Sequence, residues 1–148
     1  RSTLNEAQAD HIVKLPKFIE GQNTWELRED RNLYTEMPVK ADEQLPLQLY
    51  GRLNPRTGHV TFIHFYDRVN LRRLDIGKRH HNPTCEDVGT IHKHTWTDEF
   101  HDKWAYEPPD IEEVSTIREV FTAFLTECNI AVNGRFVEPP QEYQEVLL

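Results

Sequence analysis

Six short segments in which apolar and polar residues alternate follow one another along the chain, and they constrain the fold more than any other feature. They span residues 24–29, 32–40, 47–53, 59–66, 71–76 and 90–97. Alternation with a period of two places successive side chains on opposite faces of a sheet, so each segment predicts a strand. We therefore expect an antiparallel sheet of five or six strands.

The clearest turn lies between the third and fourth of these segments. Residues 54–58 read Asn-Pro-Arg-Thr-Gly, in which Pro55 fixes φ and Gly58 supplies conformational freedom. This turn predicts a hairpin that joins residues 47–53 to residues 59–66. The last two predicted strands are separated by residues 77–89, which we expect to form a loop over strand 90–97.

Two segments have helical patterns. Residues 5–14 contain strong helix formers, with Asn5 as a plausible N-cap and Pro16 just beyond the end. A second helix is predicted to start at Asp110, with Glu113 three residues later. Its apolar residues recur at helical spacing: Ile111, Val114, Ile117, Phe121, Phe124, Leu125 and Cys128. The Asn133-Gly134 pair then predicts a turn.

Together these elements predict an α+β fold in which an N-terminal helix and a C-terminal helix flank the sheet, the second packed on one face. A chain of 148 residues, 37% apolar and 28% charged, suits a single globular domain over residues 1–148. No apolar run is long enough to span a membrane. Because Cys85 and Cys128 are far apart in the chain, we expect reduced thiols and a cytoplasmic protein.

The charge of the chain is unevenly distributed. Its formal net charge of −8 argues against broad non-specific binding to nucleic acid. Residues 67–81 nevertheless contain five basic and two acidic side chains. We therefore expect a local basic patch that would hold RNA or a phosphate ligand. The candidate anion contacts are Arg72, Arg73, Arg79 and Lys93.

Histidines cluster in the same region. Five of the eight lie between residues 80 and 101: His80, His81, His92, His94 and His101. Alternation along the predicted strand 90–97 would place His92 and His94 on one face, with Cα atoms ~6.6 Å apart. Two imidazoles would then converge on one patch, which suits metal binding, proton transfer or phosphate binding near neutral pH.

One hypothesis is a metal site. His92 and His94 would supply two ligands to a divalent ion, zinc, iron or manganese, and Glu99 and His101 would complete the shell.

A second hypothesis is phosphodiester chemistry without a metal, as in a small ribonuclease. His92, His94 and His81 would act as acid and base, and Arg73 would stabilise the charge that develops on the phosphate. If strands 71–76 and 90–97 are neighbours, Arg73 shares a face with the two histidines. Trp96 on that face would then stack a base.

Two further interpretations need no chemistry. The histidines would merely form hydrogen bonds to the backbone and to nearby carboxylates. Alternatively, the acidic surface would bind a basic protein partner or mimic nucleic acid. The sequence leaves all four alternatives open.

Four short motifs lie within residues 71–105: Leu71-Arg72-Arg73-Leu74-Asp75, His81-Asn82-Pro83, His92-Lys93-His94 and Asp102-Lys103-Trp104-Ala105. Together they resemble a pattern found in small bacterial and phage domains of unknown function. The resemblance implies a prokaryotic or phage origin and a cytoplasmic setting, and it implies no particular chemistry.

Overall fold

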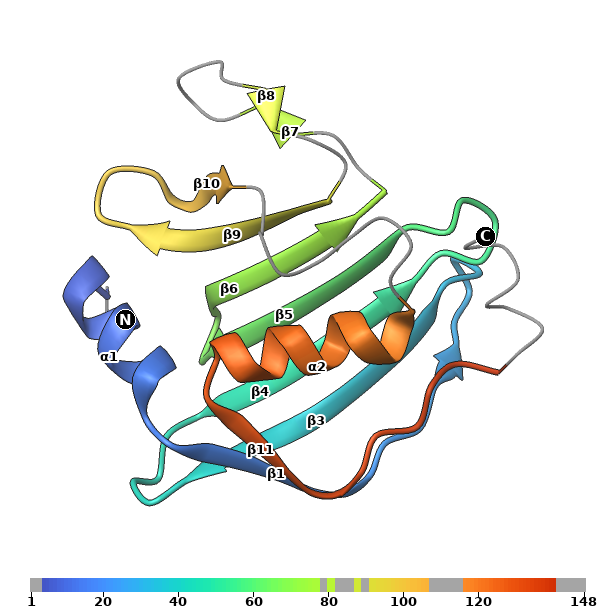
Figure 1. Cartoon of the computed structure of the whole chain (residues 1–148), viewed down its shortest axis with the longest axis horizontal. Coiled ribbons are helices and arrows are strands. Elements are labelled where there is room, and N and C mark those ends of the chain that lie inside the picture. Colours follow the sequence, from blue (N-terminus) through green and yellow to red (C-terminus); the bar gives the residue numbers. More distant parts are fainter. Residues whose placement is uncertain (1–3, 78–79, 82–86, 89–90, 107–115, 141–148) are drawn as a thin grey trace.

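The computed structural model describes residues 4–77, 80–81, 87–88, 91–106 and 116–140. Strands dominate these residues, and one helix lies near each end of the chain (Figure 1). The elements in chain order are α1 (Glu6–Lys14), β1 (Lys17–Gln22), β2 (Glu26–Leu27), β3 (Leu33–Ala41), β4 (Leu47–Leu53), β5 (Val60–Tyr66), β6 (Val69–Ile76), β7 (His80–His81), β8 (Asp87–Val88), β9 (Ile91–Thr97), β10 (His101–Tyr106), α2 (Ile117–Glu127) and β11 (Ile130–Arg135).

The described strands form one large sheet and one small one. The large sheet has nine strands in the order β10-β9-β6-β5-β4-β3-β1-β11, with β2 paired to β3. The small sheet is the antiparallel pair of β7 and β8, within the segment predicted to be a loop. The α+β class is confirmed, and each of the six predicted strands is present. The predicted number of five or six strands is wrong, because β1, β10 and β11 also join the sheet.

The prediction that the sheet is purely antiparallel is also wrong, because β1 and β11 pair in parallel. Gly21 and Gly134 are partners in the register of this pair. A Cβ on Gly134 would lie 2.2 Å from the carbonyl oxygen of Gly21, so only glycine fits there. The turn predicted at Asn133-Gly134 is therefore a stretch of strand in which glycine allows two backbones to come close.

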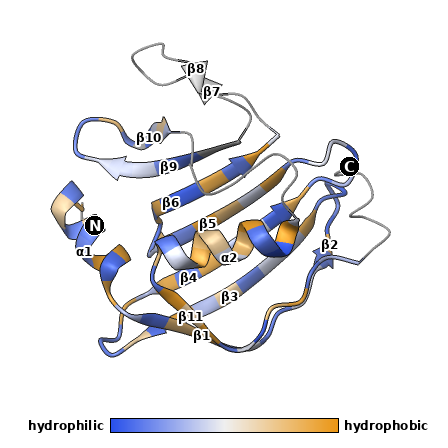
Figure 2. Ribbon diagram, in the orientation of Figure 1, coloured by the Kyte–Doolittle hydropathy of each residue, from blue (hydrophilic) through white to orange (hydrophobic). Residues whose placement is uncertain are grey.

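The core lies between α2 and the middle of the sheet. The ring of Phe62 on β5 packs against Phe121 and Phe124 of α2, with centroid separations of 5.2 and 6.3 Å. The α2 face of β3 and β4 is apolar while the other face is more polar, an alternation visible along the strands in Figure 2. The packing of the C-terminal helix on one face is thus confirmed.

The start of α2 differs from the prediction. The described helix begins at Ile117, and Thr116 is its N-cap in a capping box with Glu119. The predicted N-cap Asp110 lies outside the described residues. The Thr-x-x-Glu pattern at residues 116–119 is the sequence signal for this helix start, and the prediction did not use it.

Helix α1 begins as predicted, and the buried Lys17 of β1 lies just beyond its end. Asn5 is its N-cap, in a capping box with Gln8. At the other end, Nζ of Lys17 donates hydrogen bonds to the carbonyl oxygens of three residues at 2.7, 2.7 and 2.8 Å, namely Ile12, Val13 and Leu15. This ammonium satisfies carbonyls that the end of a helix leaves without partners. Burial lowers the pKa of Lys17 to about 8.

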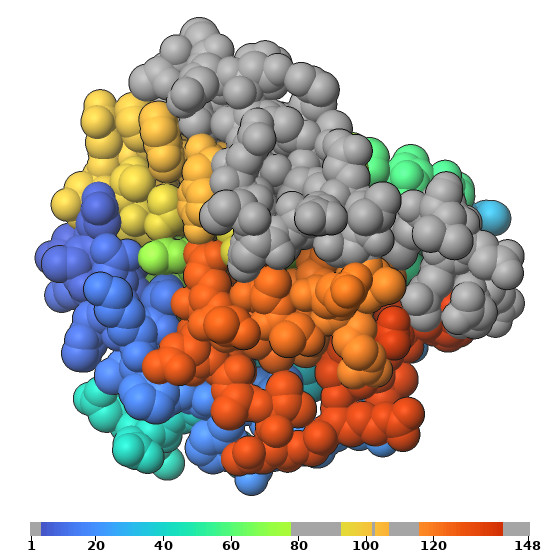
Figure 3. Space-filling model, in the orientation of Figure 1, coloured from blue at the N-terminus to red at the C-terminus, as the bar shows by residue number. Residues whose placement is uncertain are grey.

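Both helices lie on the same face of the sheet. In the space-filling view, α2 lies at the front of the molecule and α1 at its left side (Figure 3). Arg72 joins the two helices, because its guanidinium contacts Asp10 of α1 at 3.1 Å and Glu127 at the end of α2 at 3.5 Å. We call the opposite face of the sheet, which carries Tyr50, Thr61 and Arg73 and which α1 and α2 do not cover, the open face. Neither α1 nor α2 is long and apolar enough to cross a membrane.

Candidate functional site

Side chains on the open face form two rows that cross the central strands. The rows follow directly from the antiparallel register, in which opposing residues point to the same side. One row runs through His94, Arg73, Ile63 and Tyr50, and the other through Asp75, Thr61, Arg52 and Tyr34.

The sequence prediction about Arg73 depended on β6 and β9 being neighbours, and the register confirms that they are. Arg73 lies opposite His94, and Asp75 lies opposite His92. The side chain of His92 lies outside the part of the chain that the structure describes. Arg73 and His94 therefore share the open face, as predicted.

The guanidinium of Arg73 is held by two buried side chains. Its Nε donates to Oδ2 of Asp75 at 2.8 Å, and its Nη2 lies 2.8 Å from Nε2 of His94. Oδ1 of Asp75 in turn accepts a hydrogen bond from the Thr61 hydroxyl at 2.7 Å. Asp75 and His94 are only 2% and 1% exposed, whereas Arg73 is partly exposed. The network thus fixes a charged group at the edge of the protein interior.

Nε2 of His94 has two polar neighbours, Nη2 of Arg73 at 2.8 Å and Oδ2 of Asp75 at 3.3 Å. A guanidinium can only donate hydrogen bonds, so the contact with Arg73 is a hydrogen bond in the tautomer whose proton lies on Nδ1. Nε2 therefore faces Arg73 and Asp75. In this arrangement His94 orients Arg73.

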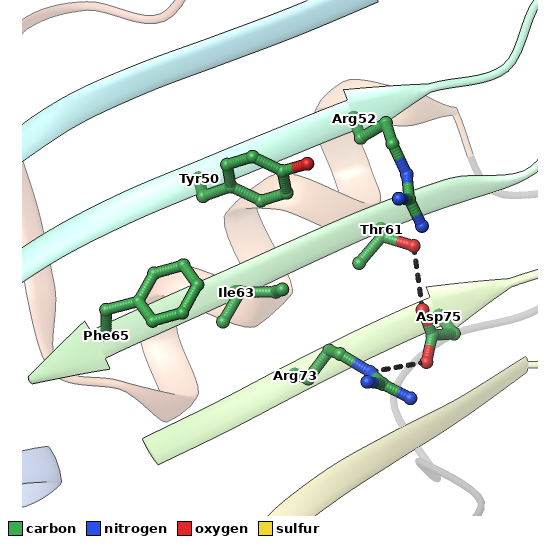
Figure 4. Close-up of a pocket in the computed structure, with 7 residues that line it drawn as sticks. All are labelled: Tyr50, Arg52, Thr61, Ile63, Phe65, Arg73 and Asp75. Carbon is green, nitrogen blue, oxygen red and sulfur yellow. Dashed lines mark hydrogen bonds and ion pairs between the residues drawn. The ribbon is translucent and has the colours of Figure 1, made fainter. Parts of the chain in front are cut away.

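A cavity of about 410 Å³ lies beside this network on the open face (Figure 4). In the figure the ribbon of the helices lies behind the strands that carry the labelled side chains. Such a volume suits a small organic ligand. The cavity combines cations, rings and hydrogen-bonding groups, and its lining residues are Tyr50, Arg52, Thr61, Ile63, Phe65, Arg73 and Asp75.

Arg52 is the second cation of the cavity. Among the described residues, no carboxylate lies within ion-pair distance of its guanidinium. Its charge lowers the pKa of the nearby Asp30, although hydrogen bonds from Tyr34 and Asn32 are larger causes of that shift. Arg52 is therefore a positive group that its described neighbours leave without an ion-pair partner.

The aromatic side chains of the open face contact one another. The Tyr50 ring lies 6.1 Å from the Phe65 ring and 6.0 Å from the Tyr34 ring, measured between centroids. The Arg28 guanidinium carbon lies 4.2 Å from the centroid of Tyr34, in a cation–π contact. Burial raises the pKa of Tyr50, so its phenol is neutral at physiological pH.

Of the seven residues that line the cavity, only Arg73 was predicted from the sequence as a site residue; the other six are Tyr50, Arg52, Thr61, Ile63, Phe65 and Asp75. Each is an ordinary residue of an alternating strand. The one available signal was that Tyr50 and Arg52 are two residues apart and so share a face.

Two predicted anion contacts lie on the other face of the sheet. Arg72 and Lys93 are adjacent in sequence to Arg73 and His94, so alternation turns them toward the helices. There Arg72 and Lys93 form ion pairs with Glu127, which also accepts a hydrogen bond from the Tyr106 hydroxyl at 2.6 Å. The structure does not bring Arg72 or Lys93 to the cavity.

Among the residues that it describes, the structure does not bring the predicted metal ligands together. The ring of His101 stacks on Trp96 with centroids 4.6 Å apart, and Glu99 is exposed in the turn between β9 and β10. Within the described part of the chain, no three or more His, Cys, Asp or Glu side chains are grouped to hold a metal ion. Binding of zinc, iron or manganese stays a prediction.

Other predicted groups lie elsewhere or outside the described part. The Trp96 indole is buried, and its Nε1 donates to the Leu4 carbonyl at 3.1 Å, so it does not line the cavity. The backbone of His81 pairs with Asp87 between β7 and β8, but its side chain is outside the description. Arg79 and Cys85 lie outside the described residues. Cys128 is a buried free cysteine, and burial raises the pKa of its thiol to about 12.

The fold and the site define a small α+β domain with a ligand-sized cavity on the open face of its sheet. The model of DUF6978, a family of unknown function, matches residues 4–130, so the chain belongs to this family. Comparisons with curated proteins and with solved structures gave no match. The resemblance to domains of unknown function is thus confirmed, while a bacterial or phage origin stays a prediction.

Proposed function

We propose that this protein binds a phosphate-bearing ligand in the cavity of the open face, with Arg73 as the main anion contact. The proposal depends on one observation: Asp75 and His94, both buried, hold the Arg73 guanidinium at the wall of the cavity.

A fixed guanidinium suits phosphate better than a mobile one. Arginine presents several donors in a planar fork that matches the oxygens of phosphate. Asp75 and His94 engage Nε and Nη2, so less side-chain entropy is lost when an anion binds to the remaining donors. Asp75 also balances the charge of Arg73 when no ligand is bound. Arg52 supplies a second positive group at the same cavity.

The other walls of the cavity favour a ligand with a flat ring. Tyr50 and Phe65 offer aromatic surfaces, while Thr61 and Asp75 offer hydrogen-bonding oxygens. Bases stack on aromatic side chains in many nucleotide-binding and RNA-binding proteins. A nucleotide combines such a ring with a phosphate, and it is therefore the ligand class that this cavity suits best.

We favour binding over catalysis for the described residues. A general base needs an accessible lone pair near the reacting proton, and Nε2 of His94 already contacts Arg73. Phosphodiester cleavage by His92 or His81, and metal binding by His92 with Glu99 and His101, remain separate hypotheses.

The test is a titration of the protein with inorganic phosphate and with nucleoside monophosphates, followed by isothermal calorimetry. We expect Arg73→Gln to weaken binding by about 10-fold to 100-fold, as loss of a charge-assisted hydrogen bond does. Arg73→Lys keeps the charge but loses the fork, so it should recover only part of the affinity. Arg68→Gln is the matched control, because Arg68 is exposed outside the cavity in the turn between β5 and β6.

Two results would contradict the proposal. One is an absence of binding by every phosphate compound at millimolar concentration. The other is binding that Arg73→Gln and Arg68→Gln weaken to the same extent, since that would indicate a general effect of positive charge.

A further inference from the structure

We infer that the ligand is a single-stranded nucleic acid that lies across β5, β4 and β3, with successive bases on Phe65, Tyr50 and the Arg28–Tyr34 pair. This inference rests on the proposed function and goes one step further, because it names a polymer where a single nucleotide would satisfy the cavity.

The first support is a third row, made of aromatic side chains, which runs diagonally across the two rows described above and continues beyond the cavity. Phe65, Tyr50 and Tyr34 come from three adjacent strands, β5, β4 and β3. Their centroids are separated by 6.1 and 6.0 Å, and their planes are inclined to one another by 79° between Tyr50 and Phe65 and by 56° between Tyr34 and Tyr50. The cavity includes only the first two of these rings, and the row therefore extends past the space that one nucleotide would fill.

At the third place in this row, the surface available to a base is the Arg28 guanidinium, which covers the ring of Tyr34. Tyr34 is only 9% exposed, and the Arg28 guanidinium lies over its ring at 4.2 Å. Glu26 and Glu36 hold Arg28 there with contacts of 3.0 and 3.3 Å. An arginine plane stacks nucleobases as aromatic rings do, so this place offers a flat, fixed surface to a third base.

The spacing of the row favours a single strand over a duplex. Bases within a duplex strand are stacked 3.4 Å apart along the axis. The rings of Phe65, Tyr50 and Tyr34 lie about 6 Å apart and in steeply inclined planes, so bases that contact them have to be unstacked from one another, as in an extended strand. A duplex would also keep its bases away from a sheet face.

The charges of the open face indicate where the phosphates run. Arg52 and Arg73 line the cavity, whereas Glu26 and Glu36 surround Arg28 at the other end of the row. Phosphates should therefore lie over Arg52 and Arg73, and the end of the row near Glu36 should receive a base alone. With a net charge of −8, the rest of the surface should repel nucleic acid and confine it to this face.

The experiment compares ligands of increasing length on the full chain. Uridine monophosphate, a uridine trinucleotide, a uridine hexanucleotide and a 12-base-pair duplex are titrated by calorimetry in the same buffer. We expect the trinucleotide to bind at least 10 times more tightly than the mononucleotide, the hexanucleotide to bind about as tightly as the trinucleotide, and the duplex to bind at least 10 times more weakly.

Variants then test the row itself. Tyr50→Leu removes a ring on which one base would stack, so it should weaken trinucleotide binding by about 5-fold to 100-fold. Arg28→Ala should reduce trinucleotide binding and leave mononucleotide binding unchanged. Because Arg28 is exposed, this variant should fold, and it tests the row even if Tyr50→Leu does not fold. Tyr66→Leu is the control, since Tyr66 lies on the other face beside α1.

The outcomes separate the inference from the proposed function. If the mononucleotide and the trinucleotide bind equally and Arg73→Gln weakens both, the polymer inference is wrong and the phosphate site stands. If Arg28→Ala changes neither ligand, the third place in the row is wrong. If neither ligand binds, both proposals fail.

Discussion

Arg73 and His94 face each other across β6 and β9, with 2.8 Å between Nη2 of the guanidinium and Nε2 of the imidazole. The pair joins two segments that are separated in sequence by a stretch rich in histidine. This relationship makes His94 a positioning residue for the proposed phosphate contact, because it contacts the guanidinium and not the cavity.

We therefore expect His94→Leu to weaken phosphate binding by about 3-fold to 10-fold, because an unrestrained Arg73 loses more side-chain entropy when it binds. His94→Gln, whose side-chain oxygen can accept the same hydrogen bond, should restore most of the affinity. Calorimetric titration of folded variants measures both effects. His11→Leu on the exposed side of α1 is the control, and an equal loss in that variant would argue against a positioning role.

The salt dependence of binding should be shallow. Two arginines that each neutralise one phosphate predict a slope of about −1.4 in a plot of log affinity against log salt for a single strand. Arg52→Gln should reduce the magnitude of this slope by about half. A steep slope, about −4 or beyond, would place the phosphate contacts on a larger surface than the open face provides.

Acid should destabilise the fold through His64. This side chain is fully buried, its Nδ1 lies 3.2 Å from the Gln48 carbonyl oxygen, and its Nε2 has no hydrogen-bond partner among the described residues. Burial lowers the pKa of His64 to about 4, so the folded protein keeps this imidazole neutral. The unfolded chain takes up a proton as the pH falls below about 6.5.

Between pH 6.5 and pH 4 the unfolded chain therefore binds more protons, and the free energy of unfolding should fall by up to about 3 kcal/mol. His64→Leu should remove this contribution and flatten the pH dependence in that range. Urea denaturation at a series of pH values measures the free energy of unfolding and its pH dependence in both proteins. An unchanged slope in His64→Leu, with the wild-type slope also kept in His11→Leu, would assign the acid sensitivity to other groups.

Loss of the Lys17 ammonium should destabilise α1. Lys17→Met removes three hydrogen bonds to carbonyls at the end of this helix and leaves those carbonyls without a charged donor. We expect a loss of about 2 kcal/mol in the free energy of unfolding. Lys14→Met, at an exposed position of the same helix, should change stability by less than about 0.5 kcal/mol.

The parallel pair of β1 and β11 should not tolerate a side chain at Gly134. In Gly134→Ala the new Cβ would meet the backbone of Gly21, so the two strands would have to move apart. Such a clash should lower the free energy of unfolding by about 2 kcal/mol or more. Asn133→Ala, at the neighbouring exposed position, is the control in the same denaturation experiment. A stable Gly134→Ala protein would mean that β11 can leave β1 at little cost.

The sequence predicted the central strands well because their signal is local. Residues 47–53 alternate, residues 60–66 are rich in β-branched and aromatic side chains, and a turn with Pro55 and Gly58 lies between them. The structure pairs the two segments as a hairpin. The strands that were missed carry weaker patterns. In β11, every residue after Ile130 is exposed, and β1 becomes polar after Ile19. Their pairing in parallel depends on the path of the chain through α2, which no local pattern encodes.

The site was predicted in part for the same reason. The shared face of Arg73 and His94 followed from alternation and from the neighbouring positions of two strands. Alternation also separates Arg72 and Lys93 from that face, yet these residues were grouped with Arg73 by their charge alone. Tyr50 and Arg52 gained importance only once the helices were seen to cover the other face, which the pattern of a single strand does not reveal.

The pairing of Lys17 with Ile130 also has a consequence for biosynthesis. The ribosome releases β1 early, but its parallel partner emerges only after almost all of the sheet has been made. Such non-local pairings form late and slowly. Until then β1 leaves an unpaired edge beside β3, where another nascent chain can add a strand. We therefore expect this protein to be exposed to aggregation in the interval before β11 is made.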